Sequence, residues 1–291
     1  MTNARKRRFG DRKDGYWLRD LDALHAFAPY LMPYRTENEA FILEQIDLTN
    51  ILAYLEKKNA DQPAYKYTMF HVITAALAKA LTLRPKMNRF IKGNRIYERN
   101  ELTFAFVVKK QFADEAHEAL AFLSFDENCT VDVVHDRIMH EIYECRSDKL
   151  DNSTAIMDVL AKLPRPILKC LVGILNILDY YGRVPYSLIK TDPNYASVFM
   201  SNLGSIGLKA GYHHLNNWGT NSIFVTIGEK MLRPVYDAGG NFEIRPVLEL
   251  GLTLDERIAD GYYYAKTVKL VKHLLQNPEL LERPAHEEVA L

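Results

Sequence analysis

Hydrophobic residues recur at helical spacing between residues 68 and 83, and this stretch carries the clearest periodic signal in the chain. Its apolar positions are Met69, Phe70, Ile73, Ala76, Leu77, Ala80 and Leu81. Spacings of three and four residues place such side chains on one face of a helix, and Pro85 ends the pattern because proline cannot continue a helix. The segment therefore predicts an amphipathic helix that packs against a core.

Other segments alternate with a period of two residues or form short apolar runs, which is typical of strands. Strands are predicted over residues 41–48, 104–108, 197–200, 222–227 and 247–254, with a hairpin turn at 237–240. Further helices are predicted over 49–55, 130–143 and 262–275. Strands and helices do not alternate strictly, and the sequence has no Gly-x-Gly-x-x-Gly motif or phosphate loop. A doubly wound nucleotide-binding fold is therefore not indicated.

The segment from 148 to 193 is rich in leucine, isoleucine and proline, but its periodicity is uneven. We expect one or two helices there and no catalytic role. Its longest apolar run, 167–178, is interrupted by Lys169 and Asn176. The run is also shorter than the roughly 20 residues that a membrane-spanning helix needs. A core or lid helix is favoured, and a helix lying on a membrane surface is the alternative.

Composition and charge indicate which partners the protein is expected to bind and in which compartment it is expected to lie. The 37 Lys and Arg residues balance the 37 Asp and Glu residues, so no net charge attracts nucleic acid or an anionic membrane. Cys129, Cys145 and Cys170 lie far apart, which suits a reducing compartment and predicts a cytoplasmic protein. Residues 1–15 contain a basic run without the apolar core of a signal peptide. They are expected to be a disordered lead-in to a single domain over 16–291.

Two short motifs in the C-terminal third carry the strongest chemical signal. Ser201-Asn202-Leu203-Gly204 ends a predicted strand, and Asp255-Glu256-Arg257-Ile258-Ala259-Asp260-Gly261 precedes the final predicted helix. With the helix over 68–83, they resemble the catalytic domain of the dihydrolipoyl acyltransferase component of 2-oxo acid dehydrogenase complexes. That domain shares its fold with chloramphenicol acetyltransferase. The resemblance covers most of the chain from about residue 29 and is weakest over 148–193. In that family the second motif reads Asp-His-Arg-x-x-Asp-Gly, so Glu256 replaces the catalytic histidine.

The resemblance implies an α/β fold, a two-layer sandwich in which a mixed sheet packs on helices. It also implies a homotrimer with the active site at the subunit interface. Ser201 would stabilise the oxyanion of the tetrahedral intermediate, a role worth a factor of about 10² to 10³ in rate. Asp260 falls on the structural aspartate, and Asn202 is a candidate substrate-binding residue. Judged from the residues alone, Ser201 could instead bond to local backbone, and Asp260 could be only a helix cap.

A glutamate is a weak base for this chemistry. Proton transfer from a thiol of pKa ~8.5 to a histidine of pKa ~6.5 is about 2 units uphill, whereas transfer to a glutamate of pKa ~4.3 is about 4 units uphill. Burial could raise the pKa of Glu256 and close this gap, while the charge of Arg257 would lower it if the two side chains met. A working glutamate and a lost catalytic base are both open readings.

His213 and His214 follow Ser201 by twelve and thirteen positions. They are candidates for the missing imidazole and for substrate binding, and a packing or surface role is the alternative. No Cys, Asp or Glu at ligand spacing accompanies them, so no metal site is predicted. His71, on the helix over 68–83, is expected to be a partly buried core residue.

These features favour a stand-alone coenzyme A-dependent acyltransferase that moves an acyl group from a thioester to a thiol or hydroxyl acceptor. Acyl-coenzyme A or acyl-lipoamide would be a substrate, and no tightly bound cofactor is expected. The alternative is a catalytically inactive trimeric relative that acts as a binding or scaffold protein. A third hypothesis, an enzyme acting at a membrane surface on lipid-like acyl donors, rests only on residues 167–178 and the neighbouring tyrosines.

Overall fold

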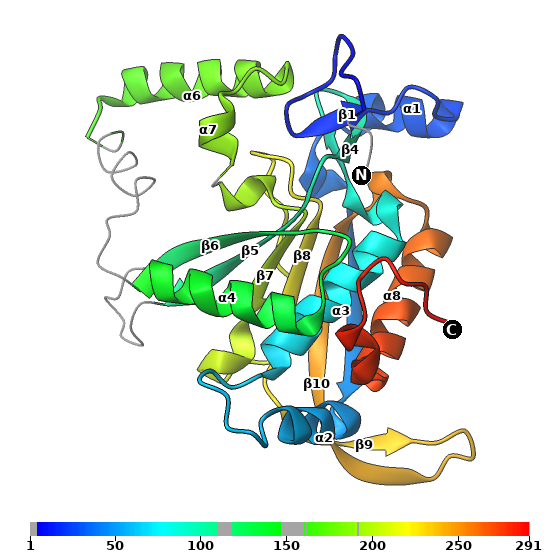
Figure 1. Ribbon diagram of the computed structural model, residues 1–291. Helices are drawn as coiled ribbons and strands as arrows, with labels where there is room; N and C mark the ends of the chain where they lie inside the picture. Colours follow the sequence, from blue (N-terminus) through cyan, green and yellow to red (C-terminus); the bar gives the residue numbers. More distant parts are fainter. Residues whose placement is uncertain (1–4, 110–117, 147–159, 161, 191, 291) are drawn as a thin grey trace.

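The computed structural model describes residues 5–109, 118–146, 160, 162–190 and 192–290 (Figure 1). Its helices are α1 (Ala23–Leu31), α2 (Thr49–Lys58), α3 (Met69–Leu83), α4 (Val131–Arg146), α6 (Arg165–Tyr180), α7 (Tyr186–Ile189) and α8 (Gly261–Gln276). Its strands are β1 (Gly15–Trp17), β2 (Glu39–Asp47), β3 (Arg89–Lys92), β4 (Arg95–Arg99), β5 (Leu102–Lys109), β6 (Glu118–Phe125), β7 (Val198–Asn202), β8 (Ile223–Ile227), β9 (Met231–Tyr236) and β10 (Phe242–Asp255). Short 3-10 turns follow β7, at Leu203–Ile206, and β10, at Glu256–Ile258.

A seven-stranded mixed sheet forms the centre of the protein. Its strand order is β2-β10-β8-β7-β5-β6, and β9 extends one end of β10 as a hairpin. The pairs β5–β7 and β7–β8 are parallel, and the other pairs are antiparallel. A small second sheet has the order β1-β4-β3. The mixed sheet with helices confirms the predicted α/β two-layer sandwich.

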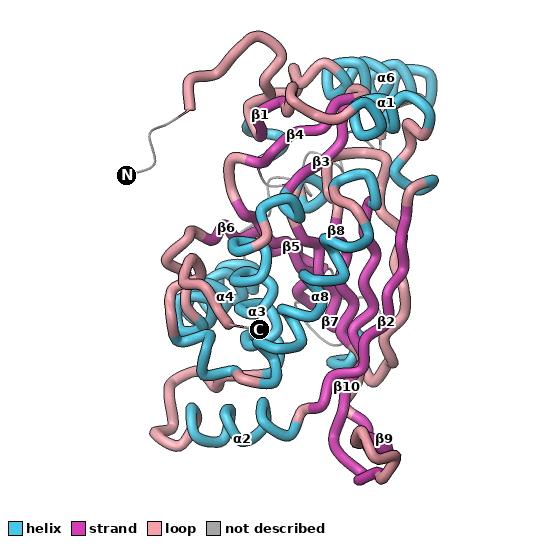
Figure 2. Tube along the Cα trace, turned by 90° about the vertical axis from the view of Figure 1, so that its right-hand side faces the viewer, coloured by secondary structure: helices cyan, strands magenta, loops and turns pink. Residues whose placement is uncertain are grey.

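Helices α3, α4 and α8 cover one face of the large sheet, whereas loops lie on the other face (Figure 2). Alternate residues of the strands point into the helix-covered face, as the two-residue period requires. In β10 these are Leu248, Leu250, Leu252 and Leu254, all in the main hydrophobic core. The helix face therefore holds the apolar positions that the sequence pattern marks.

Helix α3 lies at the middle of that core and agrees with its prediction. Residues 71–81 are all buried. The Thr68 amide donates to Nδ1 of His71 at 3.0 Å, which satisfies a free amide at the helix start. His71 itself is buried, as expected, and burial together with the neighbouring His135 lowers its pKa to about 4.

The opposite face of the sheet is more open. Phe41 and Leu43 of β2 point there and are 51% and 48% exposed. The loop from 207 to 222 crosses this face above β8 and β10, where the Thr226 hydroxyl donates to the Gly211 carbonyl. This open face carries the candidate site.

The N-terminal segment, expected to be a disordered lead-in, is attached to the fold at Arg12 and Gly15. Arg12 is buried, and its guanidinium pairs with Asp14 at 2.9 Å and with Asp179 at 3.1 Å. Gly15 already pairs with Arg99 in the small sheet. Since Asp179 is 167 positions away, no local sequence pattern could have paired it with Arg12.

Other differences concern short or ambiguous elements. Strands β1, β3, β4 and β6 and helix α1 were not predicted. The β6 run of alanine, leucine and phenylalanine fits a buried helix as well as a strand, because periodicity cannot separate short apolar runs. Among the described residues between 160 and 193, α6 and α7 agree with the expectation of helices, but α6 is exposed, so a core helix is wrong. Among the described residues, no helix has the length and apolarity to cross a bilayer.

Candidate functional site

Ser201 lies near the end of β7 on the open face of the sheet. Its neighbours Val198 and Met200 belong to the core, so Phe199 and Ser201 point the other way. Within the described residues the Ser201 hydroxyl makes no hydrogen bond, which argues against the reading that it only bonds to local backbone. Gly204 of the same motif has a packing reason: a Cβ there would lie 2.5 Å from the Gly228 carbonyl oxygen.

Asn202 has a local structural role. Its side-chain oxygen accepts from the Ser205 amide at 3.3 Å and caps the short 3-10 turn after β7. The Ser205 hydroxyl donates back to the Asn202 carbonyl at 2.7 Å. Asn202 therefore shapes the end of β7 beside Ser201, and its role in substrate binding stays a prediction.

The second motif contains a buried ion network that the sequence reading missed. The Arg257 guanidinium donates two hydrogen bonds to Asp255, Nε to Oδ1 at 2.8 Å and Nη2 to Oδ2 at 2.7 Å. Arg35 lies 3.6 Å from the same carboxylate, and all three side chains are buried. The Asp-x-Arg spacing was a signal for this pair. The charge of Arg257 is thus directed at Asp255 and not at Glu256.

Glu256 begins a 3-10 turn directly after β10, where its amide donates to the Asn38 carbonyl at 2.9 Å. Its side chain is exposed. Its carboxylate makes no hydrogen bond or ion pair with any described residue. The burial that would turn Glu256 into a better base is therefore absent within this one chain.

Asp260 caps α8. Its carboxylate accepts from the Tyr263 amide at 2.8 Å, and this bond holds the pKa of Asp260 below its usual value. The carboxylate is exposed, and it stabilises the first turn of the helix through the free amides found there. This position gives the aspartate of the motif a structural role.

Register places Ser201 and Glu256 far apart in the same chain. Ser201 pairs with Thr226, which in turn pairs with Gly251 of β10, two strands away from β7. Glu256 follows Asp255, four residues further along β10. At about 3.3 Å per residue and about 4.8 Å per strand spacing, Ser201 and Asp255 are on the order of 16 Å apart. One chain alone therefore does not bring the two predicted catalytic side chains together.

The segment 211–215 spans this gap. Gly211 is held above Thr226, at the Ser201 end, while the Leu215 amide donates to Oε1 of Glu39, the residue opposite Asp255. His213 lies between these ends. Its ring stacks on Phe224 with centroids 4.1 Å apart, and Phe224 is two residues from Thr226 on the same face of β8.

The hydrogen bonding of His213 selects one tautomer. Its Nδ1 lies 2.8 Å from the His214 carbonyl oxygen. Because a carbonyl only accepts, Nδ1 must carry the proton, and Nε2 of the neutral ring then has a free lone pair. His214 stacks on His213 with centroids 4.6 Å apart, and both rings are exposed. An imidazole oriented in this way is suited to general base catalysis.

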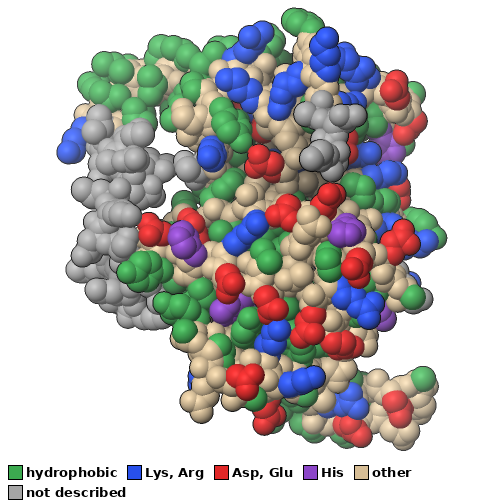
Figure 3. Space-filling model, viewed as in Figure 1, with side chains coloured by type: hydrophobic (Ala, Val, Ile, Leu, Met, Phe, Trp, Pro, Cys, Tyr) green, Lys and Arg blue, Asp and Glu red, His purple; other side chains and the backbone are tan. Residues whose placement is uncertain are grey.

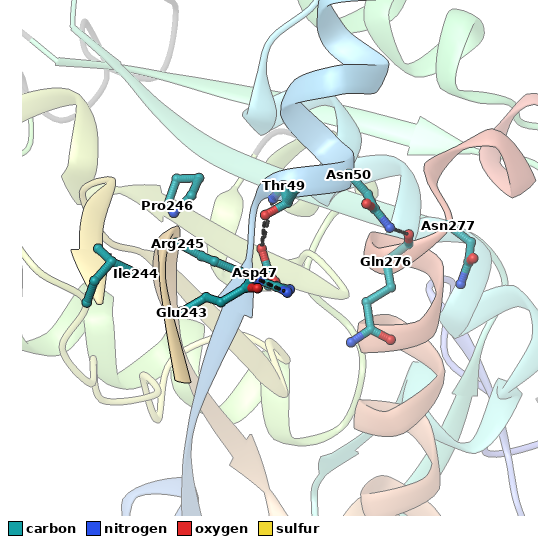
Figure 4. Close-up of a pocket in the computed structure, with 9 residues that line it drawn as sticks. All are labelled: Asp47, Thr49, Asn50, Glu243, Ile244, Arg245, Pro246, Gln276 and Asn277. Carbon is teal, nitrogen blue, oxygen red and sulfur yellow. Dashed lines mark hydrogen bonds and ion pairs between the residues drawn. The ribbon is translucent and has the colours of Figure 1, made fainter. Parts of the chain in front are cut away.

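A polar cavity of about 780 Å³ lies at the opposite end of β10, lined by Asp47, Thr49, Asn50, Glu243, Ile244, Arg245, Pro246, Gln276 and Asn277 (Figure 4). Asp47 accepts from the Thr49 hydroxyl at 2.6 Å and pairs with Arg245 at 2.9 Å. Burial raises the pKa of Asp47, but these bonds outweigh it and hold the pKa below its usual value. Arg245 also pairs with Glu243 at 2.8 Å, and none of the predicted site residues lines this cavity.

No group of three or more potential metal ligands occurs among the described residues.

Sequence comparison supports the family resemblance. Residues 187–282 match the profile of the 2-oxoacid dehydrogenases acyltransferase (catalytic domain) family. The matched region contains both motifs and the His213-His214 segment. The sequence pattern of this acyltransferase domain is thus present in the C-terminal third, as the motifs predict. Among curated proteins, no sequence matches the chain.

Solved structures extend the fold likeness to nearly the whole chain. A probable dihydrolipoamide acetyltransferase from Listeria monocytogenes superposes with a TM-score of 0.60 at 16% identity, over 89% of this chain and 94% of that one. The dihydrolipoamide acetyltransferase of Azotobacter vinelandii gives 0.60 at 17% identity, over 89% and 88%. A chloramphenicol acetyltransferase gives 0.51 at 12% identity, over 88% and 96%. The chain therefore has the chloramphenicol acetyltransferase-like fold.

Proposed function

We propose that this chain is a stand-alone acyltransferase that moves an acyl group from acyl-coenzyme A or acyl-lipoamide to a thiol or hydroxyl acceptor. The observation that carries the proposal is the path of residues 211–215. They place the free Nε2 of His213 on the same sheet face as the unbonded Ser201 hydroxyl. Ser201 and Phe224, the residue under the His213 ring, are about 8 Å apart across the sheet, which leaves room for reacting atoms between them.

The proposed reaction uses His213 as the base. Its Nε2 takes the proton from the acceptor thiol or hydroxyl, and the freed sulfur or oxygen attacks the thioester carbonyl carbon. The Ser201 hydroxyl donates to the resulting oxyanion. The tetrahedral intermediate then expels the thiolate of the donor, which receives the proton from Nε2. Atoms and charges balance without a further reactant.

Glu256 belongs to the site through assembly. In the Azotobacter vinelandii enzyme, a serine, a histidine and an asparagine have been investigated for roles in catalysis, and the last two are four positions apart, as Glu256 and Asp260 are here. Since Asp255, the residue before Glu256, is on the order of 16 Å from Ser201 within one chain, we propose a homotrimer in which Glu256 approaches Ser201 of the next subunit. There it would contact the substrate while His213 supplies the imidazole.

The test is turnover of acetyl-coenzyme A with dihydrolipoamide as the acceptor. Ser201→Ala should lower kcat by about 10² to 10³ with little change in substrate affinity, because the oxyanion exists only in the transition state. Ser205→Ala is the matched control, since its hydroxyl is already bonded to a local carbonyl, and it should retain most activity. Absence of turnover by the wild-type protein across a panel of acyl donors would overturn the proposal in favour of a non-catalytic binding or scaffold protein.

A further inference from the structure

Helix α6 lies at one end of the protein, largely clear of the main core (Figure 1). Asp179 is its one buried residue. Leu178 packs partly against a small cluster of Val184, Ile189 and Tyr195. One side of the helix thus rests on the protein, and the remainder faces outward.

The outward side carries an apolar stripe. Ile167, Ile174 and Ile177 are 53%, 51% and 60% exposed, Tyr181 is 70% exposed, and Cys170 is exposed as well. These five residues are spaced by three and four positions, which aligns them on one side of the helix. Contiguous exposed apolar surface of this kind marks an interaction site.

A buried ion cluster holds this stripe in place. The Asp179 carboxylate pairs with Arg12 at 3.1 Å and with Lys92 at 2.5 Å. Arg12 also donates to the Asp179 carbonyl at 2.6 Å. The carboxyl end of α6 is therefore attached to the N-terminal segment and to β3, so the stripe is presented in a defined orientation.

Cations surround the stripe. Between 162 and 190 the exposed charged residues are Lys162, Arg165, Lys169, Arg183 and Lys190, whereas the one acid, Asp179, is buried. The N-terminal segment that Arg12 attaches to the same end adds the exposed residues 5–8, Arg-Lys-Arg-Arg, followed by Phe9, which is 90% exposed. Figure 3 shows hydrophobic and basic side chains side by side along this edge. The balanced net charge of the chain conceals this local excess.

We propose that α6 and residues 5–9 form a docking surface for a membrane that contains anionic lipids. The apolar stripe and Phe9 enter the boundary between headgroups and acyl chains, and the lysines and arginines meet the lipid phosphates. Tyr180 and Tyr181 at the helix end have the amphipathic character that favours this depth. A second copy of the chain fits less well, because a self-complementary contact would bring these cations against one another. This proposal does not depend on the proposed acyl transfer.

Vesicle flotation with the full-length protein tests the proposal. We expect strong binding to phosphatidylcholine vesicles that contain roughly 30% phosphatidylglycerol, because this anionic lipid attracts the lysines and arginines. Binding to vesicles of pure phosphatidylcholine should be weak. Raising the salt concentration should weaken binding to the anionic vesicles, because headgroup attraction is screened. Ile174→Glu/Ile177→Glu should lower the bound fraction at least about tenfold by placing charge in the stripe.

The matched control is Leu232→Glu/Ile244→Glu on the β9–β10 hairpin, where both apolar side chains are also exposed but lie outside α6. This variant should bind vesicles like the wild type. Circular dichroism and thermal melting must show that both double variants are folded. No binding to anionic vesicles, or equal loss in both variants, would overturn the proposal. A wild-type oligomer that dissociates in Ile174→Glu/Ile177→Glu without vesicles would instead identify a second copy as the occupant.

Discussion

The two faces of the seven-stranded sheet differ in how far their side chains are buried. On the helix-covered face, Leu250 and its neighbours in β10 belong to the same hydrophobic core as α3 and α8. The apolar side chains there are buried within one chain. On the open face, Ser201 and His213 lie outside the core, and apolar residues such as Leu43 are half exposed. The first face stabilises the fold. The second holds the candidate site residues Ser201 and His213.

The largest expected effect concerns His213, the proposed base on the open face. His213→Gln should lower turnover of acetyl-coenzyme A and dihydrolipoamide by about 10² to 10⁴, because the amide keeps a similar shape but cannot accept the proton. His214→Gln is the matched control. Its turnover should stay within roughly a few-fold of the wild-type value, because His214 takes no part in the proposed proton transfer. If Glu256→Gln shows the larger loss and His213→Gln retains activity, glutamate is the base and the assignment to His213 fails.

Substitutions on the helix-covered face should instead change the free energy of unfolding. Leu250→Ala removes a fully buried side chain from the core and should lower the free energy of unfolding by about 2 to 5 kcal/mol, measured by urea denaturation. Glu249→Ala, the next residue on the other face of β10, should change it by about 0.5 kcal/mol or less. Similar losses in the two variants would contradict the division between the faces.

His71 gives the helix-covered face a pH dependence. Its pKa is lowered from 6.5 to about 4 by burial and by His135, so the unfolded chain binds a proton before the folded one does. The stability that neutral His71 contributes to the folded state is complete above pH 6.5. As the pH falls toward 4, the free energy of unfolding should drop by roughly 2 to 4 kcal/mol. Urea denaturation between pH 7 and 4 gives the free energy of unfolding as a function of pH. This free energy should fall less steeply with decreasing pH in His71→Gln than in the wild type. An unchanged slope would mean that other groups control the acid response.

The smallest expected effect on folding comes from the apolar residues of the open face. Leu43→Lys should change the unfolding free energy of one chain by about 0.5 kcal/mol or less, because the side chain is already half exposed. If this face joins the subunits of a trimer, however, the buried lysine should dissociate it. Light scattering would then show the mass falling from that of three chains to that of one. A wild-type protein that is monomeric at all concentrations would refute the trimer.

The sequence by itself determined the elements with strong periodicity and the two short motifs that carry the family resemblance. Helix α3, the leucines of β10 and the Ser201 and Asp260 motifs are local patterns, because side-chain direction repeats every 3.6 or 2 residues. It could not determine the pairing of Arg12 with Asp179, since that pairing joins residues 167 positions apart. Only the tertiary structure decided that register separates Ser201 from Glu256 and that residues 211–215 place His213 between them. Distances across a sheet depend on strand order, and strand order is a property of the whole fold.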